Sequence, residues 1–271
     1  MSLQDETQPQ SASRRLIVWG AGELGSRVAQ LWQTHGGPVT GFTQSERRHP
    51  DLIAAGITPR TGSPVDLLQT DDALLLSLPG HETQADAIKQ LTAQGIAAPI
   101  RVVMVSTIGY FGPQAHGIIN EETPPSSDSR SRSIAAAEQL FQQWAGPAGV
   151  IIRCGGLYSQ ARGPMSALRR RRTMKVRPPD KTLALIHYDD AATAIFEALR
   201  HPSPEPIYLA VVSPCPTRKE FYTRACQRLD LPAPQFDAPI GMPPAQYQVE
   251  RLHRDLLPVP AYPDWQAALE V

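Results

Sequence analysis

RLIVWGAGELG, residues 15–25, joins an apolar run of strand length to the start of a helical pattern. Between the two lie three glycines with the spacing G-x-G-x-x-G. In such a turn Gly20 permits the tight bend, Gly22 lets a diphosphate approach the backbone, and Gly25 lets the helix pack closely on the strand. The amides at the start of the helix would then bind the anion. The motif alone also occurs in unrelated glycine-rich turns, but the flanking strand and helix favour a dinucleotide-binding unit.

Further apolar runs and helical patterns alternate along the chain. The apolar runs lie at 38–42, 73–78, 101–106 and 149–154, and the helical patterns at 24–35, 46–55, 83–94 and 133–144. This alternation favours right-handed crossovers, which place the strands in a parallel sheet with helices on both faces. We therefore expect an α/β fold with a doubly wound parallel sheet (Rossmann-type) and a small C-terminal substrate-binding subdomain.

The same pattern divides the chain into three regions. Residues 1–13 are polar and aperiodic, which predicts a flexible tail. Residues 14–160 form the expected dinucleotide-binding domain, and residues 161–271 the smaller substrate-binding region. Within the latter, a helical pattern around 189–200 begins with Asp189 and Asp190, whose carboxylates suit a helix start. We expect that helix to pack back on the sheet of the larger domain.

The composition restricts the class of partner. The 271 residues carry 26 Lys and Arg against 26 Asp and Glu, so the chain is formally neutral. Neutrality disfavours nucleic acid or an anionic membrane as the main partner and favours a small-molecule substrate. Three scattered cysteines and seven dispersed histidines lack metal-ligand spacing, so we expect no metal. Because no run has the length of a membrane span or the character of a signal peptide, we expect a cytoplasmic protein.

The end of the second predicted strand bears on which dinucleotide is bound. A ribose 2′-hydroxyl is held by Asp or Glu at this point, whereas a 2′-phosphate attracts arginine. Here residues 41–45 contain no acid, and Arg47 and Arg48 follow. We therefore expect NADP(H) in preference to NAD(H), with Thr43 and Arg47 contacting the cofactor. The alternative is that the two arginines only form the solvated start of a helix.

Five segments, in order, resemble those of the extended and atypical short-chain dehydrogenase/reductases, the NAD(P)-dependent epimerase/dehydratase-like family. They are the glycine motif, Ser77 to Pro79, Ser106 to Gly112, Arg153 to Tyr158 with Arg162 to Pro164, and Ile186 to Ala192. The resemblance implies an oxidoreductase or epimerase/dehydratase-like enzyme acting on a small polar substrate, carbonyl or sugar-like, and it allows a homodimer. The predicted cofactor-binding residues are then Gly20, Gly22, Glu23, Leu24, Gly25, Thr43, Arg47, Leu78, Pro79 and Thr107.

The resemblance also implies a catalytic role for Thr107, whose hydroxyl would hold the substrate oxygen beside the nicotinamide. The other catalytic pair of the family, a tyrosine with a lysine four residues later, is absent, because none of the seven tyrosines has lysine at that offset. The corresponding positions align with Arg130 and Ile134. Tyr110, three residues after Thr107, is the candidate proton donor, although an aromatic side chain there can instead pack against the cofactor.

Other side chains that could carry chemistry have simpler interpretations. Tyr158 and His187 correspond to the substrate region of the resembled family, yet both also suit structural roles. The arginines at 169–172 could bind an anion or form a solvated face. The missing tyrosine and lysine leave a second class of function open, a non-catalytic NADP(H)-binding redox sensor or regulatory protein. A hydrolase is disfavoured because the chain has no G-x-S-x-G motif.

Overall fold

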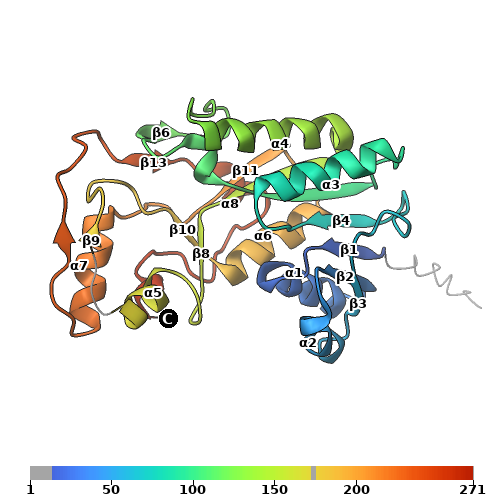
Figure 1. The fold of residues 1–271 in the computed structure, drawn as a ribbon, viewed down its shortest axis with the longest axis horizontal. Coiled ribbons are helices and arrows are strands. Elements are labelled where there is room, and N and C mark those ends of the chain that lie inside the picture. Colours follow the sequence, from blue (N-terminus) through green and yellow to red (C-terminus); the bar gives the residue numbers. More distant parts are fainter. Residues whose placement is uncertain (1–13, 172–174, 271) are drawn as a thin grey trace, which may run out of the picture.

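The computed structural model of the protein describes residues 14–171 and 175–270, and its centre is one parallel sheet (Figure 1). The sheet has seven strands in the order β11-β7-β5-β4-β1-β2-β3, and every pairing is parallel. Its strands are β1 (Leu16–Trp19), β2 (Val39–Thr43), β3 (Thr58–Thr61), β4 (Ala73–Leu76), β5 (Arg101–Thr107), β7 (Gly149–Cys154) and β11 (Ile207–Ala210). Because the chain order reverses at β1, between β2 and β4, the sheet is doubly wound. The predicted fold class is confirmed.

Helices cover both faces of the sheet. On one face lie α1 (Glu23–Thr34) and α6 (Tyr188–Arg200), and on the other α3 (His81–Ala93) and α4 (Ser129–Ala145) (Figure 1). Strand β1 contributes side chains to the cores on both faces of the sheet. Leu16 and Val18 belong to the core beneath α1 and α6. Ile17 and Trp19 belong to the core beneath α3 and α4. Burial on both sides explains why the strand is a continuous apolar run rather than an alternating one.

Within the main sheet and its covering helices, α4 and β3 differ from the sequence expectation for identifiable reasons. Helix α4 begins at Ser129, before the predicted start at 133, because the Asp128 carboxylate accepts from the Ser131 amide (3.1 Å) and caps the helix. Its first turn is polar and therefore carries no apolar periodicity. Strand β3 was not predicted, because Thr58–Thr61 is an edge strand with mostly exposed, polar side chains.

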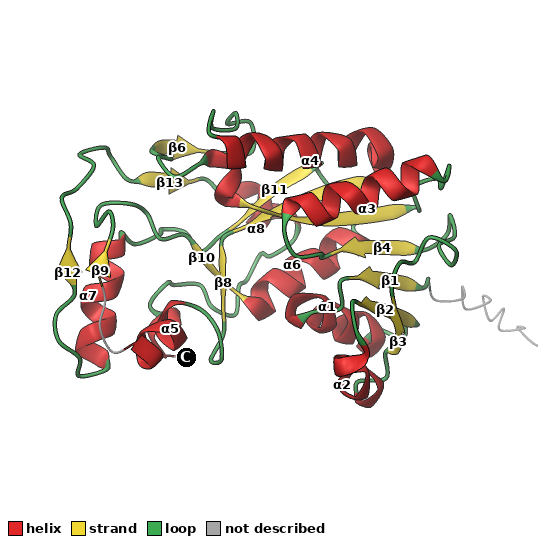
Figure 2. Cartoon of the chain, viewed as in Figure 1, coloured by secondary structure: helices red, strands yellow, loops and turns green. Residues whose placement is uncertain are grey.

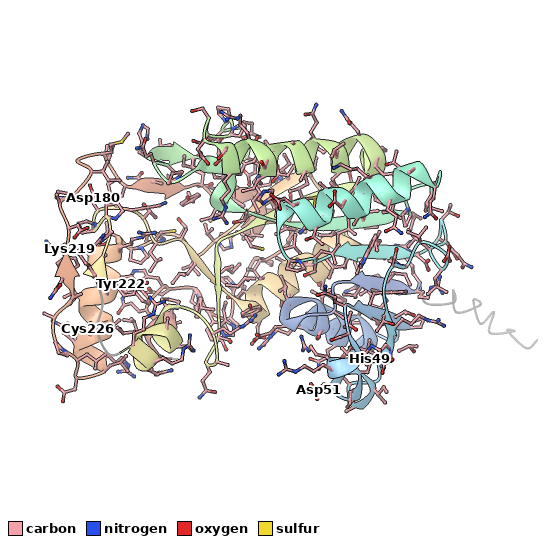
Figure 3. The ribbon with its side chains drawn as sticks, viewed as in Figure 1. His49, Asp51, Asp180, Lys219, Tyr222 and Cys226 are labelled. Atoms are coloured by element: carbon pink, nitrogen blue, oxygen red, sulfur yellow. The ribbon has the colours of Figure 1, made fainter. Side chains whose placement is uncertain are left out.

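A smaller lobe lies at one end of the sheet (Figure 2). Its elements are β8 (Gly156–Tyr158), α5 (Pro164–Arg171), β9 (Lys175–Val176), β10 (Leu185–His187), α7 (Arg218–Arg228), β12 (Gln235–Phe236) and α9 (Ala267–Glu270). Cys226 of α7, labelled with Tyr222 in Figure 3, belongs to the core of this lobe together with Phe221 and Leu185. Helix α5 was not predicted, because the sequence pattern there is dominated by consecutive arginines.

The main sheet and its helices include elements from both predicted parts of the chain, 14–160 and 161–271. Helix α6 and strand β11 come from the later part of the chain, yet they cover and extend the main sheet. Asp190 of α6 accepts from the backbone amides of Ala261 (2.8 Å) and Tyr262 (3.0 Å), so the C-terminal stretch is fastened to that helix. Two expectations lie outside the described residues: the flexible tail at 1–13 and the part of the arginine run at Arg172.

The remaining elements are short. They are the 3-10 helices η1 (Glu46–Arg48), η2 (Ile108–Phe111) and η3 (Gly146–Ala148), the helices α2 (His49–Ala54) and α8 (Glu250–Asp255), and the paired strands β6 (Gly117–Ile119) and β13 (Ala245–Tyr247). Within 14–171 and 175–270, no helix combines the length and apolar character needed to cross a bilayer. The same residues contain no group of three or more potential metal ligands.

Candidate cofactor and active site

The glycine turn between β1 and α1 has one open position and two closed ones. Gly20 has a φ of +100°, and a Cβ there would lie 2.6 Å from the carbonyl carbon of Ser77, just after β4. A Cβ on Gly25 would lie 2.9 Å from the Val18 side chain. At Gly22, in contrast, a Cβ would meet nothing nearer than 4.0 Å. At Gly20 and Gly25, therefore, neighbouring atoms leave no room for a side chain, whereas the space beside Gly22 is open.

The start of α1 presents backbone donors to that space. Gly22 is the N-cap residue, and no side-chain hydrogen bond from the described residues caps the helix. The amides that follow, including those of Glu23 and Leu24, lack partners within the helix and suit an anion. The Glu23 carboxylate interacts elsewhere: it accepts from Arg27 (3.3 Å) and from Ser159 Oγ (3.3 Å) in the loop after β8. Glu23 can thus serve a ligand through its backbone while its side chain ties that loop to α1.

The 3-10 helix η1, which follows β2, brings Arg48 rather than Arg47 to the glycine turn. Arg48 Nη2 donates to Ser26 Oγ (3.4 Å), and its Nη1 lies 4.0 Å from the position of a Cβ on Gly22. Arg47 is exposed. Consecutive residues of the 3-10 helix η1 point about 120° apart, so only one of two neighbouring arginines can face the turn. The sequence did not distinguish them.

Thr43, also predicted to contact the cofactor, has a hydroxyl that is already engaged. Its Oγ1 donates to the Ser45 carbonyl (2.9 Å) and lies 3.0 Å from Nε2 of His49, which Figure 3 labels at the start of α2. Leu78 and Pro79 follow β4, and the Leu78 amide nitrogen lies 2.9 Å from the position of a Cβ on Gly20. Gln84 Nε2 donates to the Leu78 carbonyl (3.0 Å) and to the carbonyl of Val105 (2.8 Å) on β5. This side chain fixes the ends of the two strands relative to each other.

Thr107 and Tyr110 lie at the carboxyl end of β5 and in η2. The Gly109 amide donates to Thr107 Oγ1 (3.1 Å), so the threonine caps η2, while its hydroxyl proton stays available to a ligand. The ring of Tyr110 lies on the guanidinium of Arg153, whose Cζ is 3.6 Å from the centroid of the tyrosine ring. Burial raises the pKa of Tyr110 despite this cation. At neutral pH the phenol is therefore protonated, which suits a proton donor and not a base.

Arg153 anchors a buried polar network that sequence reasoning missed. The side chain is 2% exposed and contacts Glu138 of α4, with Nη2 2.8 Å from Oε2. Ser106 Oγ of β5 donates to Glu138 Oε1 (2.5 Å), and Arg153 Nη1 donates to the Glu121 carbonyl (3.2 Å). A buried cation and anion are tolerated only when paired and hydrogen-bonded in this way. The signal available in the sequence was an arginine within the apolar strand GVIIRC.

Tyr158 and His187 lie in a different place, at the junction of the lobe with α1 and α6. His187 Nδ1 accepts from the Asp189 amide (3.1 Å) and caps α6, and its ring stacks on Tyr262 with centroids 3.6 Å apart. Burial lowers the pKa of His187. His187, Glu23 and Asp189 line a cavity of about 620 Å³. Burial raises the pKa of the Tyr158 phenol, whose buried hydroxyl has no hydrogen-bond partner among the described residues.

The two positions aligned with the missing catalytic pair lie on α4. Ile134 is 1% exposed, and its Cδ1 is 3.4 Å from the position of a Cβ on Gly109. Arg130, one helical turn earlier, is exposed. Ile134 thus packs beside η2 and Arg130 lies in the first turn of the same helix, and neither side chain reproduces the chemistry of a tyrosine and a lysine.

An open parallel sheet whose order reverses beside a G-x-G-x-x-G turn defines a doubly wound fold of the Rossmann type. No protein-family model matches the chain, and no curated protein matches it. Solved structures do share its fold. A functionally unknown conserved protein from Silicibacter pomeroyi DSS is 21% identical, with 95% of this chain and 97% of that chain covered and a TM-score of 0.76.

Two further structures carry names that describe an activity. The dTDP-glucose 4,6-dehydratase of Bacillus anthracis str. Ames, in complex with NAD, is 15% identical over 95% of this chain and 94% of its own, with a TM-score of 0.74. A human epimerase family protein with NADPH is 17% identical over 94% and 98%, with a TM-score of 0.68. The resemblance to epimerase/dehydratase-like short-chain dehydrogenase/reductases is therefore confirmed at the level of the fold.

Proposed function

We propose that the protein binds a nicotinamide dinucleotide across the carboxyl edge of its sheet and acts as an oxidoreductase or epimerase/dehydratase-like enzyme on a small polar substrate, carbonyl or sugar-like. The observation that carries the proposal is the glycine turn, where Gly20 and Gly25 exclude any side chain and Gly22 leaves the approach to the α1 amides open. Such a cradle fits a diphosphate. Similar folds with NAD and with NADPH support the same class of ligand.

We further propose NADP(H) as the preferred cofactor, with Arg48 in the role first given to Arg47. Arg48 lies beside Gly22 and Ser26 and forms no ion pair with any carboxylate of the described residues. A guanidinium in this state suits a 2′-phosphate. The absence of an acid at 41–45 removes the usual partner of a 2′-hydroxyl.

When bound, the nicotinamide would donate a hydride to a substrate carbon or accept one from it. Thr107 would donate its hydroxyl proton in a hydrogen bond to the substrate oxygen, since its lone pair already accepts from Gly109. Tyr110 would supply the proton that this oxygen takes up in a reduction, because burial keeps its phenol protonated. Arg153 and Glu138 would hold Tyr110 in position through the buried ion pair.

The experiment is a calorimetric titration of the purified protein with NADPH and, separately, with NADH. We expect NADPH to bind, and Gly22→Ala to weaken binding with little change in the melting temperature, because the free protein has room for the methyl group. Binding of neither nucleotide at millimolar concentration would refute the proposal. Equal affinity of wild type and Gly22→Ala would refute this site for the diphosphate.

A second candidate function is a non-catalytic NADP(H) sensor. It is favoured by Ile134, which is buried against the η2 turn in place of a functional side chain. Oxidation of NADPH by a panel of carbonyl and sugar substrates distinguishes the two candidates. Turnover that Thr107→Val abolishes supports the enzyme. Tight NADPH binding with no turnover across the panel supports the sensor.

A further inference from the structure

The start of α4 and the η2 turn form one tightly connected unit. The Ser126 amide donates to the Tyr110 carbonyl (3.1 Å), and Ser131 Oγ donates to the Gly109 carbonyl (2.9 Å). Gly112, at the end of η2, is packed so closely that a Cβ there would lie 2.5 Å from the Cβ of Ser126. The first turn of α4 is therefore held against the turn that carries Thr107 and Tyr110.

Arg130 lies in the first turn of α4, on the side of the helix that carries Ile134, and its side chain is exposed. The buried residues of the helix include Ile134, Ala137, Glu138 and Phe141. Arg130 precedes Ile134 by four positions, so it continues the same face one turn towards the N-terminus. Helical side chains also lean towards the N-terminus, which directs Arg130 away from the covered sheet and towards its carboxyl edge. Since Ile134 packs beside Gly109, the next turn lies next to η2.

The Arg130 guanidinium has no direct partner within the described part of the chain. It makes no hydrogen bond or ion pair with any described residue, and the side chain is exposed. The nearest carboxylate along the helix, Asp128, is engaged by the Ser131 amide (3.1 Å) and by Ser131 Oγ (2.7 Å). Those bonds lower the pKa of Asp128 to about 2. Arg132, on a different face of α4, donates instead to the Ser127 carbonyl.

We propose that Arg130 binds an oxyanion group of the substrate, a carboxylate or a phosphate, while the substrate carbonyl lies against Thr107 and Tyr110. The substrate would then be an anionic carbonyl compound. A guanidinium binds such a group through two parallel hydrogen bonds, which orients the substrate as well as attracting it. This inference rests on the proposed function, because it assumes that hydride transfer takes place beside Thr107.

The test compares charged and uncharged carbonyl compounds on the NADPH-loaded protein. Dihydroxyacetone phosphate is matched with dihydroxyacetone, and pyruvate with methyl pyruvate, so the two pairs separate a phosphate from a carboxylate. We expect the charged member of one pair to have at least tenfold lower KM. Ligand-observed NMR with NADPH and the alcohols glycerol 3-phosphate and lactate gives a readout independent of turnover, because an alcohol cannot accept a hydride from the reduced cofactor.

Arg130→Gln should raise the KM of the charged compound, and the Kd of its analogue, at least tenfold with a smaller change in kcat. Arg130→Lys should restore part of the affinity, and Arg132→Gln should behave as wild type. The NADPH Kd should be unchanged in all three variants. If charged and uncharged compounds bind equally, if no anion binds, or if Arg130→Gln matches Arg132→Gln, the inference is wrong. A wild-type protein that fails to bind NADPH would instead refute the proposed function.

Discussion

Two regions of the carboxyl edge of the sheet differ in what builds them. At the glycine turn the ligand surface is backbone, and the requirement on Gly20, Gly22 and Gly25 is the absence of side chains. At η2 and the start of α4 the proposed surface is made of side chains. Thr107 accepts a hydrogen bond from Gly109, Tyr110 lies on the buried Arg153 and Glu138 ion pair, and Arg130 is exposed on α4. The comparison teaches that the proposed dinucleotide site and the proposed catalytic site depend on different atoms, so a substitution in one can leave the other intact.

The largest expected effect tests the side-chain region. Arg153→Met should lower the free energy of unfolding by about 3–5 kcal/mol, because it leaves the Glu138 carboxylate buried without its partner. Urea denaturation measures this. The double variant Arg153→Met, Glu138→Leu should recover much of the loss, since it removes both charges. A single variant as stable as wild type would show that the ion pair does not hold this region.

The next effect separates the closed and open positions of the glycine turn. Gly20→Ala should cost about 2 kcal/mol or more of stability, because φ is +100° and the methyl group would overlap the Ser77 carbonyl. Gly22→Ala should cost less than about 0.5 kcal/mol. Thermal unfolding of the two variants provides the measurement. Equal destabilisation would contradict the assignment of Gly22 as the open position.

A smaller effect concerns the adenosine end of the proposed cofactor site. Arg48→Gln should raise the NADPH Kd about tenfold, which corresponds to about 1.4 kcal/mol, and leave the NADH Kd within about twofold. Arg47→Gln is the matched control, because it removes an identical charge from the exposed neighbour. Calorimetric titration of both nucleotides decides the matter. Identical results for the two variants would mean that neither arginine reads the 2′-phosphate.

The smallest effect is a pH dependence at the junction of the lobe with α6. Burial lowers the pKa of His187 in the folded state below its ordinary value of about 6.5, so the unfolded chain binds the proton more readily. Stability should therefore fall as the pH drops through about 6.5 and level off below the folded pKa. Chemical denaturation at a series of pH values measures it. His187→Gln should flatten the profile in that range, and an unchanged profile would exclude this histidine as its source.

The two regions also differed in how far the sequence predicted them. The glycine turn and the apolar strands were predictable, because three small residues and a burial pattern carry the information locally. The choice of Arg48 over Arg47 depends on the rotation of a 3-10 helix, which the sequence does not display. The Arg153 and Glu138 pair joins a strand to a helix, and no local pattern indicates which carboxylate pairs with the buried cation. The start of α4 was missed because its cap is polar.

Asp190 holds the backbone of Ala261 and Tyr262, which are 71 and 72 residues further along the chain. During synthesis, residues 188–200 of α6 are added to the chain before Ala261 and Tyr262, the hydrogen-bond partners of the Asp190 carboxylate. A chain shortened before residue 261 would keep its glycine turn but would leave the Asp190 carboxylate in the first turn of α6 without these two backbone partners. Such a truncated chain should be a preferred substrate for proteolytic quality control, even though every residue of the proposed cofactor site is present.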